Sequence, residues 1–558
     1  MHSDNAPGER LAELLEAAAS AEEELDERFP DVGLAWEADR VDRWRDLAER
    51  VAEIDRDALD RRDKAEYDVL ERELDHRITR YEHGIHLMPV NHEGGPHSAY
   101  IRHSSRKSFE DREAYERYLN RLENASAYFD AARELLEEGV ERDRTPPRSV
   151  LDGHGEMIDS YLVAEPTESQ LYEPFLSMPD AFDDDEQSRF REAAAAAISD
   201  AVFPALESFR EYLLESYVPE TRESTGYADL PDGEAYYEHL VRYYTTLDVT
   251  PEEVHETGLE EVERIRQEML AVIDEAGFDG GFDEFVEFLR SDPQFYPESA
   301  ETLLREAKSI AKDIDGRLPE LFTLSGMPTR PYGVEPVPED IAPNYTTGRY
   351  VPNATDTDAG TFWVNTYDLE SRPLYALPAL FLHEAVPGHH HQIAHTRELD
   401  GVSEFRRENW VTAYIEGWAL YAERLGVDLD AYDTAYERFG RLSNEMWRAC
   451  RLVVDTGIHT MGWTPAEARE FMADHTAMSL HNVRTEVDRY VAWPGQSLAY
   501  KTGEIEIRDL RADAEAELGD DFDVRAFHET LLESGPVTLP TLRENVREWI
   551  RSVADSAE

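Results

Sequence analysis

Residues 382–392 read LHEAVPGHHHQ, a histidine-rich segment interrupted by a proline and a glycine. It begins like the His-Glu-x-x-His motif, in which two histidines one helical turn apart bind zinc and the glutamate activates water. Here Pro387 stands where that motif has its second histidine. On a regular helix, at about 100° per residue, His389 would point roughly 240° away from His383, and His390 would lie about 10 Å further along the axis. An unbroken helix therefore cannot bring either later histidine to the metal held by the first.

The proline and glycine at positions 387–388 offer a way around this geometry. Proline removes a backbone donor and glycine permits unusual dihedral angles, so a two-residue bulge can return a later histidine to the required place. We therefore predict His383 and His389 as metal ligands, with His390 as the alternative second ligand. Glu384 is the candidate catalytic base. The competing interpretation is a helix that ends at the proline, followed by a solvated group of histidines.

A second segment, YIEGWALYAE at residues 414–423, places Glu416 inside an otherwise apolar and aromatic helix. A buried carboxylate needs a partner, because its desolvation is costly. Zinc in hydrolases takes three protein ligands and keeps one position open for water, so Glu416 would complete a set of two histidines and one glutamate. Glu423 shares that helical face seven residues further on. It is expected either to orient a histidine ligand or to form an ordinary salt bridge.

The segment RACRLVVDTGIH aligns four polar side chains on one side of a predicted helix: Arg448, Arg451, Asp455 and His459. Two interpretations stay open. One is a ladder of ion pairs within the helix. In the other, His459 faces a cleft and donates a hydrogen bond to the substrate or transition state, and Asp455 supports it from behind.

A mixed aromatic and basic patch comes later in the chain. It contains Arg489 and Tyr490, and then the segment PGQSLAYK, which ends in Tyr500 and Lys501. Tyr500 is a candidate for stabilising an oxyanion. Arg489, Tyr490 and Lys501 are candidates for holding a substrate, with the two cations binding a carboxylate.

Amphipathic helical periodicity dominates the chain, which predicts a mainly α, multi-helix fold. We expect an N-terminal helical region over 1–220 and a second region over 221–558 that carries the histidine segment, with a soft boundary that also allows one continuous domain. The clearest strand signal is GTFWVNT at residues 360–366, rich in aromatic and β-branched residues. It predicts a small β-sheet beside the site, and Asn365 within it is a candidate substrate ligand.

The charge balance narrows the class of partner. The 558 residues include 121 acidic residues against 56 lysines and arginines, a formal net charge of -65. A nucleic-acid partner is excluded, because its phosphates would be repelled. The five lysines and the dispersed acidic residues indicate adaptation to concentrated salt, where the Debye length falls to about 3 Å at 1 M and self-repulsion is screened.

Cysteine content and the N-terminal sequence bear on the compartment. Cys450 is the single cysteine, so disulfides within the chain and cysteine-based zinc clusters are excluded. The first residues, MHSDNAPGERLAELLEAAAS, lack a basic stretch followed by an apolar one, and no window approaches the roughly 18 apolar residues of a membrane span. We expect a soluble, cytoplasmic protein with no membrane partner; the oligomeric state is not predicted.

Together, HEAVPGHHHQ and YIEGWALYAERL resemble the bacterial and archaeal "domain of unknown function 885" family of predicted zinc metallopeptidases. The resemblance extends to LPDGEAYYEHLVRYYTTLDVTPEEVHETGL, RLVVDTGIHTMGWT, WPGQSLAYKTGEIEIRDLR and FHETLLESGPVTL. It covers most of residues 220–540 and fits the N-terminal helices more loosely.

The resemblance implies a helical, gluzincin-like fold with a deep cleft, in which a strand beside the cleft aligns a peptide. That role would fall to residues 360–366. It supports the ligand set His383, His389 and Glu416 around one zinc ion, with Glu384 as base. The expected function is metal-assisted hydrolysis of short peptides, of the carboxypeptidase or oligopeptidase type. The alternatives are a zinc amidase or esterase acting on a small substrate, and a catalytically inactive helical binding protein.

Overall fold

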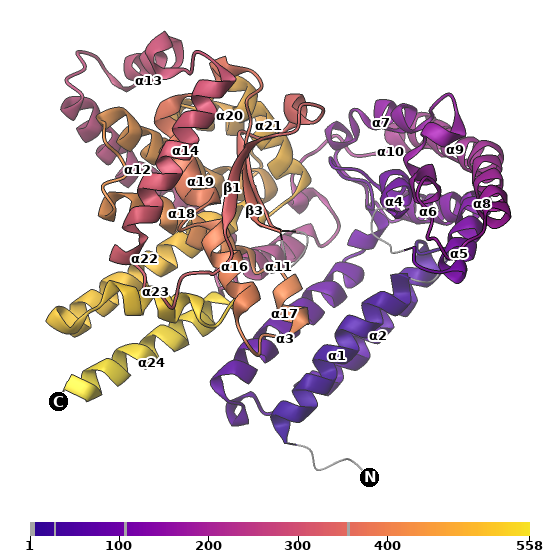
Figure 1. Cartoon of the computed structure of the whole chain (residues 1–558), viewed down its shortest axis with the longest axis horizontal. Coiled ribbons are helices and arrows are strands. Elements are labelled where there is room, and N and C mark those ends of the chain that lie inside the picture. Colours follow the sequence, from indigo (N-terminus) through magenta and orange to yellow (C-terminus); the bar gives the residue numbers. More distant parts are fainter. Residues whose placement is uncertain (1–5, 27–28, 105–108, 354–357, 558) are drawn as a thin grey trace. The chain divides into compact units, whose positions relative to one another are not determined.

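A computed structural model describes residues 6–26, 29–104, 109–353 and 358–557 of the chain (Figure 1). It is mainly helical, with one three-stranded sheet. The predicted mainly α fold with a small sheet is confirmed. The deep gluzincin-like cleft implied by the resemblance stays a prediction.

The chain divides into two compact units. Among the described residues, the larger unit contains the chain up to Leu15, Val51–Glu73, and everything from Tyr237 onward. The smaller unit contains Glu16–Arg50 and Leu74–Tyr236. The larger unit is therefore discontinuous in sequence, a division that the single soft boundary expected near residue 220 does not describe. Four helices have residues in both units: α1 (Pro7–Asp26), α2 (Leu34–Ala52), α3 (Arg61–Glu82) and α11 (Gly233–Thr245).

The smaller unit is built around aromatic side chains. Tyr100 packs against Phe129, and Tyr115 packs against Phe175, with ring centroids 5.2 and 5.5 Å apart. Such ring pairs bury large apolar areas and favour tilted or edge-to-face contact. The remaining helices of this unit are α4 (Pro96–Arg102), α5 (Arg112–Glu123), α6 (Ala125–Glu141), α7 (His154–Tyr161), α8 (Asp184–Ala197), α9 (Phe203–Tyr212) and α10 (Val218–Glu220).

The larger unit carries every residue predicted for the site. Its helices before the sheet are α12 (Pro251–Glu275), α13 (Phe282–Ser291) and α14 (Ala300–Arg317). After the sheet come α15 (Leu377–Glu384), α16 (His389–Glu398), α17 (Glu404–Glu408), α18 (Thr412–Asp428), α19 (Ala435–Thr460), α20 (Pro465–His475), α21 (Leu480–Ala492), α22 (Ala499–Leu518), α23 (Val524–Leu532) and α24 (Leu539–Ala557).

The sheet has the strand order β1 (Tyr332–Pro336), β3 (Gly360–Val364), β2 (Gly348–Val351). β3 pairs in parallel with β1 and antiparallel with β2. The strand predicted from residues 360–366 therefore exists, but it is the central one. Both of its edges are occupied, so it cannot itself add a substrate strand, contrary to the role expected for it.

Helices α18 and α22 approach closely through two glycines. A Cβ built on Gly417 would lie 2.5 Å from the Cα of Gly503, and a Cβ on Gly503 would lie 2.0 Å from the carbonyl oxygen of Ala413. Only glycine allows this backbone approach. Because Glu416 precedes Gly417, the contact fixes the place of that carboxylate.

Replacing Gly503 by alanine should force α18 and α22 apart, because the new methyl group would overlap backbone atoms of Ala413. We expect Gly503→Ala to lower the free energy of unfolding by about 2 kcal/mol or more, in line with overpacking in a filled core. Urea denaturation measures the change. The control is Gly316→Ala in α14, where an added Cβ meets no atom within 4 Å. An equal loss in both variants would contradict this account of the α18–α22 contact.

Candidate metal centre

The histidine segment forms two helices with a break between them. α15 ends at Glu384 and α16 begins at His389, so the proline and glycine at 387–388 lie in the break. A Cβ on Gly388 would lie 1.9 Å from the carbonyl oxygen of His383, which only glycine avoids. Trp418 of α18 donates from its indole nitrogen to the carbonyl oxygen of Pro387 at 2.8 Å and anchors the break. The chain thus reverses enough to place His389 beside His383.

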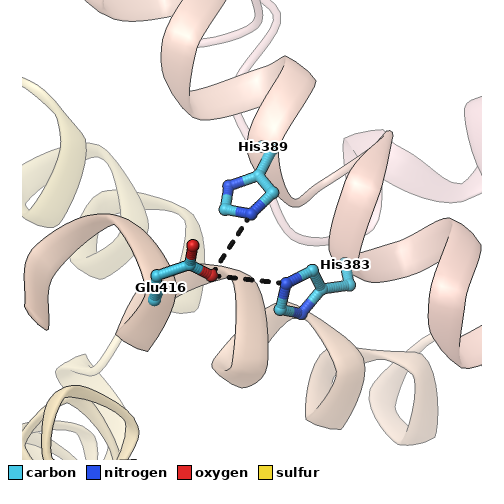
Figure 2. Close-up of side chains that lie close together, drawn as sticks. All are labelled: His383, His389 and Glu416. Carbon is cyan, nitrogen blue, oxygen red and sulfur yellow. Dashed lines mark ion pairs between the residues drawn. The ribbon is translucent and has the colours of Figure 1, made fainter. Parts of the chain in front are cut away.

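Three side chains from three helices converge at this point (Figure 2). Both histidine Nε2 atoms face one carboxylate oxygen of Glu416: His383 at 3.5 Å and His389 at 3.4 Å. The two imidazole rings are nearly perpendicular, with centroids 4.8 Å apart. His383 and His389 are 4% and 7% exposed, and the potential ligand atoms all lie within 4.8 Å of one another. The structure therefore brings together the three residues predicted as ligands.

The spacing suits a tetrahedral metal ion. Ligand atoms at about 2.0–2.1 Å from zinc in tetrahedral geometry lie about 3.4 Å from each other, close to the two distances from Glu416 to the histidines. The Oε2 atom of Glu416 is buried and has no hydrogen-bond partner of normal geometry among the described residues. A buried carboxylate oxygen of this kind calls for a cation.

The charges of these three side chains also favour a cation at this point. His389 and His383 outweigh burial and hold the pKa of the Glu416 carboxyl well below its ordinary value. Burial alone would lower the pKa of His383, but the nearby carboxylates of Glu416 and Glu423 outweigh burial and raise the pKa to about 9. Glu416 is therefore ionised, and positive charge is favoured beside it. A bound metal ion would supply that charge and leave the histidines neutral.

Glu423 lies behind the first histidine. Its Oε1 is 2.9 Å from Nδ1 of His383, and Nη2 of Arg448 lies 3.6 Å from the same oxygen. An Nδ1–H bonded to a carboxylate leaves Nε2 as the free ligand atom and fixes the ring orientation. Glu423 was expected either to orient a histidine ligand or to form an ordinary salt bridge. Its position behind His383 fits the first of these roles.

Glu384 is half-buried at the end of α15. Its Oε2 accepts a 2.8 Å hydrogen bond from the backbone N–H of Tyr350 in the edge strand β2. The alternative ligand His390 turns to a different environment: its Nδ1 lies 3.1 Å from the hydroxyl of Tyr350, and its ring packs against Tyr332. The geometry thus favours His389 over His390 as the second ligand.

Tyr500 stands near the same group. It is half-buried, with the guanidinium of Arg451 over its ring at 4.4 Å. Burial and the nearby charge of Glu416 both raise the pKa of the Tyr500 hydroxyl, and Arg451 and Arg489 oppose them. Arg489 is partly exposed and donates to Oε1 of Gln496 at 2.9 Å. Tyr500 is therefore a protonated phenol, able to donate a hydrogen bond beside two guanidinium groups.

Tyr490 lies in the core and not at the surface. It is 1% exposed, and its hydroxyl accepts hydrogen bonds from Trp447 and Arg451, both at 3.0 Å. Arg451 also pairs with Glu486 at 3.2 Å. The substrate contact predicted for Tyr490 is corrected: the residue holds Arg451 under Tyr500.

The prediction that Lys501 binds substrate also needs correction. Its ammonium is fully buried and lies 2.9, 2.8 and 2.7 Å from Glu261, Glu445 and Glu504. Three arginines contact the same carboxylates: Arg264, Arg441 and Arg508. The three carboxylates could hold a metal by spacing alone, but the ammonium already occupies their centre. This is a charge network within the core.

His459 and Asp455 are structural as well. His459 is 0% exposed, and its Nε2 donates to the backbone carbonyl of Tyr490 at 2.9 Å, so it does not face a substrate. Asp455 accepts from the N–H of Gly495 at 2.9 Å and from Ser497 at 2.7 Å. It holds the loop that leads into Tyr500.

Asn365 likewise cannot reach a substrate, because it is 0% exposed. Its side-chain amide donates to three backbone carbonyls of the segment before β2: Ala342, Tyr345 and Thr346. Its side-chain oxygen accepts from the N–H of Tyr367 at 2.9 Å. The residue shapes the approach to β2.

Two residues near the centre escaped the sequence reasoning. The ring of Trp410 lies 6.5 Å from that of His389 and is 48% exposed, and Tyr350 supplies the backbone donor to Glu384. For Trp410 the available signal was a tryptophan six residues before Glu416. The hydrogen bond from Tyr350 to Glu384 is donated by a backbone N–H, so the type of side chain at position 350 does not indicate it.

Two solved structures share this fold. The crystal structure of "the putative lipoprotein from Colwellia psychrerythraea" has 26% sequence identity and a TM-score of 0.86, covering 98% of this chain and 100% of that one. A "putative lipoprotein of unknown function from Shewanella oneidensis" has 17% identity and a TM-score of 0.76, covering 96% and 98%. The second likeness shows the fold alone. No curated protein matches the chain.

The Colwellia relative contradicts the predicted cytoplasmic location. It is described as a putative lipoprotein, a class that a lipid attaches to a membrane. The prediction rested on the first residues of the sequence and is wrong. Among the described helices, none is long and apolar enough to cross a membrane.

The family comparison spans nearly the whole chain. Residues 16–546 match the model described as "Bacterial protein of unknown function (DUF885)". The match includes both segments that meet at the metal centre and also the N-terminal helices, where the sequence resemblance was looser. The chain belongs to the DUF885 family.

Proposed function

We propose that this protein is a zinc-dependent hydrolase that cleaves short peptides. The observation that carries the proposal is the convergence of His383, His389 and Glu416 on one point, with Glu423 bonded behind the first histidine. This donor set is the one that hydrolytic zinc sites use, with three protein ligands and an open position.

The three converging side chains would hold the ion. When bound, zinc would polarise a scissile carbonyl and lower the pKa of water toward about 7. Glu423 keeps His383 in the tautomer that offers Nε2, and Arg448 balances the charge of Glu423. No other side chain is needed to complete this ligand set.

Glu384 serves as the general base. It follows His383 directly and is half-buried, and the Tyr350 N–H holds one of its oxygens at 2.8 Å. The other oxygen is the one proposed to take a proton from water and pass it to the leaving amine. Tyr500, a neutral phenol, donates a hydrogen bond to the developing oxyanion.

The edge strand β2 supports a peptide as substrate. Thr347 and Asn365 are bonded across the sheet, so in this antiparallel pair Gly348 and Tyr350 direct their backbone groups outward. The outward N–H of Tyr350 meets Glu384, which places this edge next to the base. An extended peptide can pair with such an edge through backbone hydrogen bonds. Arg489 pairs with Glu486 at 3.3 Å. We propose that its partly exposed guanidinium also receives a terminal carboxylate, which favours carboxypeptidase or oligopeptidase action.

Glu384→Gln should abolish hydrolysis and keep the metal. Loss of a general base costs about 10²- to 10⁴-fold in rate, whereas the ligand side chains are unchanged. The assay uses a panel of free and N-blocked di- to tetrapeptides, with simple esters and amides alongside, and metal analysis of the same samples. Glu335→Gln, on the exposed end of β1, is the control and should retain activity. Equal turnover in Glu384→Gln and wild type would rule out this base.

Glu423→Gln should weaken zinc binding by about 10- to 100-fold, as second-layer substitutions usually do. The cause is loss of the anionic acceptor that fixes the His383 ring. Competition against a chelating dye measures the affinity. Glu404→Gln, an exposed residue of α17, should leave it unchanged. An unaltered affinity in Glu423→Gln would contradict the orienting role.

We also propose that the chain functions in concentrated salt, given its formal charge of -65. Its melting temperature should rise between about 0.15 and 1 M KCl, as the Debye length falls from about 8 to 3 Å and repulsion is screened. Differential scanning calorimetry measures this, with sorbitol of equal osmolality as the uncharged control. A melting temperature that KCl leaves unchanged, or that sorbitol raises as much, would refute salt adaptation.

A further inference from the structure

A cavity in the larger unit is lined in part by residues of the histidine segment. Its volume is about 420 Å³, within the usual range for small-molecule sites. α14 and the segment 327–334 form its walls, and Val386, His390 and His391 close it. None of the three candidate metal ligands lines it. It is therefore a separate site within the same unit.

The wall opposite α14 is held by hydrogen bonds. Glu398, the last residue of α16, accepts from the backbone N–H groups of Thr329 and Arg330 at 2.9 and 3.1 Å. The hydroxyl of Tyr332 donates to Asp315 of α14 at 2.9 Å. These bonds tie the segment to both neighbouring helices, so the cavity is formed before any ligand binds.

The cavity gathers positive charge in a strongly acidic protein. Lys308 and Lys312, two of only five lysines, stand one helical turn apart on α14. Arg330 also lines the cavity, but its guanidinium pairs with Glu398 at 3.9 Å. Asp315 is the single acidic residue among the lining side chains. Lys308 forms no ion pair with any described residue, and Lys312 reaches Asp315 only at 4.0 Å. The local excess of cations is suited to an anion.

The rest of the lining is apolar, with one buried polar group. Met327, Val334 and Val386 contribute apolar surface. His391 is 0% exposed, and neither of its ring nitrogens has a hydrogen-bond partner of normal geometry in the described part of the chain. The backbone of Gly326 offers this imidazole one weak hydrogen bond. A ligand group in the cavity would satisfy the ring nitrogen that this bond leaves buried without a partner.

We propose that this cavity binds a small organic carboxylate with an apolar body. The carboxylate pairs with Lys308 and Lys312 near the opening, and the apolar body lies against Val334 and Val386 with a polar atom facing His391. Charge-assisted hydrogen bonds fix the acid group, and the apolar wall adds the burial that an inorganic anion could not supply. This site does not depend on the proposed hydrolase activity.

The test uses 4-phenylbutyrate as probe and isothermal titration calorimetry as readout. The protein is first treated with a chelator, so that a carboxylate cannot bind through a metal. Lys308→Gln and Lys312→Gln should each weaken binding about tenfold, as expected for loss of one charged partner. Arg305→Gln is the matched control, because it removes an exposed cation from the same helix outside the cavity. Its affinity should stay within about twofold of wild type.

Two further samples locate the probe. Val334→Trp, which fills the cavity, should abolish binding, whereas His383→Ala should bind as wild type does. The neutral analogue 4-phenylbutan-1-ol should bind at least about tenfold more weakly than the acid. No binding to wild type, equal binding of acid and alcohol, or equal losses in the Arg305 and lysine variants would overturn the proposal. Each result leaves the zinc hydrolase proposal to be judged separately.

Discussion

The buried carboxylate of Glu416 is the constraint on which the centre of this protein depends. An ionised group removed from water must meet opposite charge or several donors. Here two imidazole nitrogens meet one oxygen at 3.4 and 3.5 Å. That meeting requires a helix break between the histidines and a glycine contact beside the glutamate. The helix break and the glycine contact thus both help to bring the two histidines and Glu416 together.

Among the described residues of the larger unit, two groups of three potential ligands occur, and their surroundings distinguish them. The carboxylates of Glu261, Glu445 and Glu504 enclose the ammonium of Lys501, and arginines cover them from outside. The group of His383, His389 and Glu416 contains no lysine or arginine within its own set of contacts among the described residues. The distances between the potential ligand atoms do not distinguish the two groups. The identity of the charge at the centre separates a core network from a metal site.

The sequence predicted those features that depend on residues near one another in the chain. The histidine segment with its proline and glycine indicated the break, and a glutamate within an apolar helix indicated the third ligand. Roles that depend on burial were misjudged. Lys501, His459 and Asn365 are polar residues next to a promising motif, yet each is fully buried and has at least one partner far away in sequence. Their partners include Glu445 for Lys501 and backbone carbonyls for the other two, and no local pattern encodes such contacts.

The strand order of the sheet also depends on contacts between residues that are distant in sequence. Aromatic and β-branched residues identified β3, but strand order depends on pairing across loops, so the sequence could not show that β3 is central and β2 is the edge beside Glu384. The cationic cavity behind the histidine segment also arises from packing, since its lysines and His391 lie about 80 residues apart.

The most direct test of the central claim is the zinc content of the purified, folded chain, compared with that of Glu416→Gln and of the exposed control Glu404→Gln. Mass spectrometry of the metal, with circular dichroism on the same samples, gives both quantities. We predict about one zinc ion per chain in wild type and control, and less than about a tenth of that in folded Glu416→Gln. A folded wild type that takes up no zinc even when the ion is supplied, or a Glu416→Gln variant that retains it fully, would contradict the account.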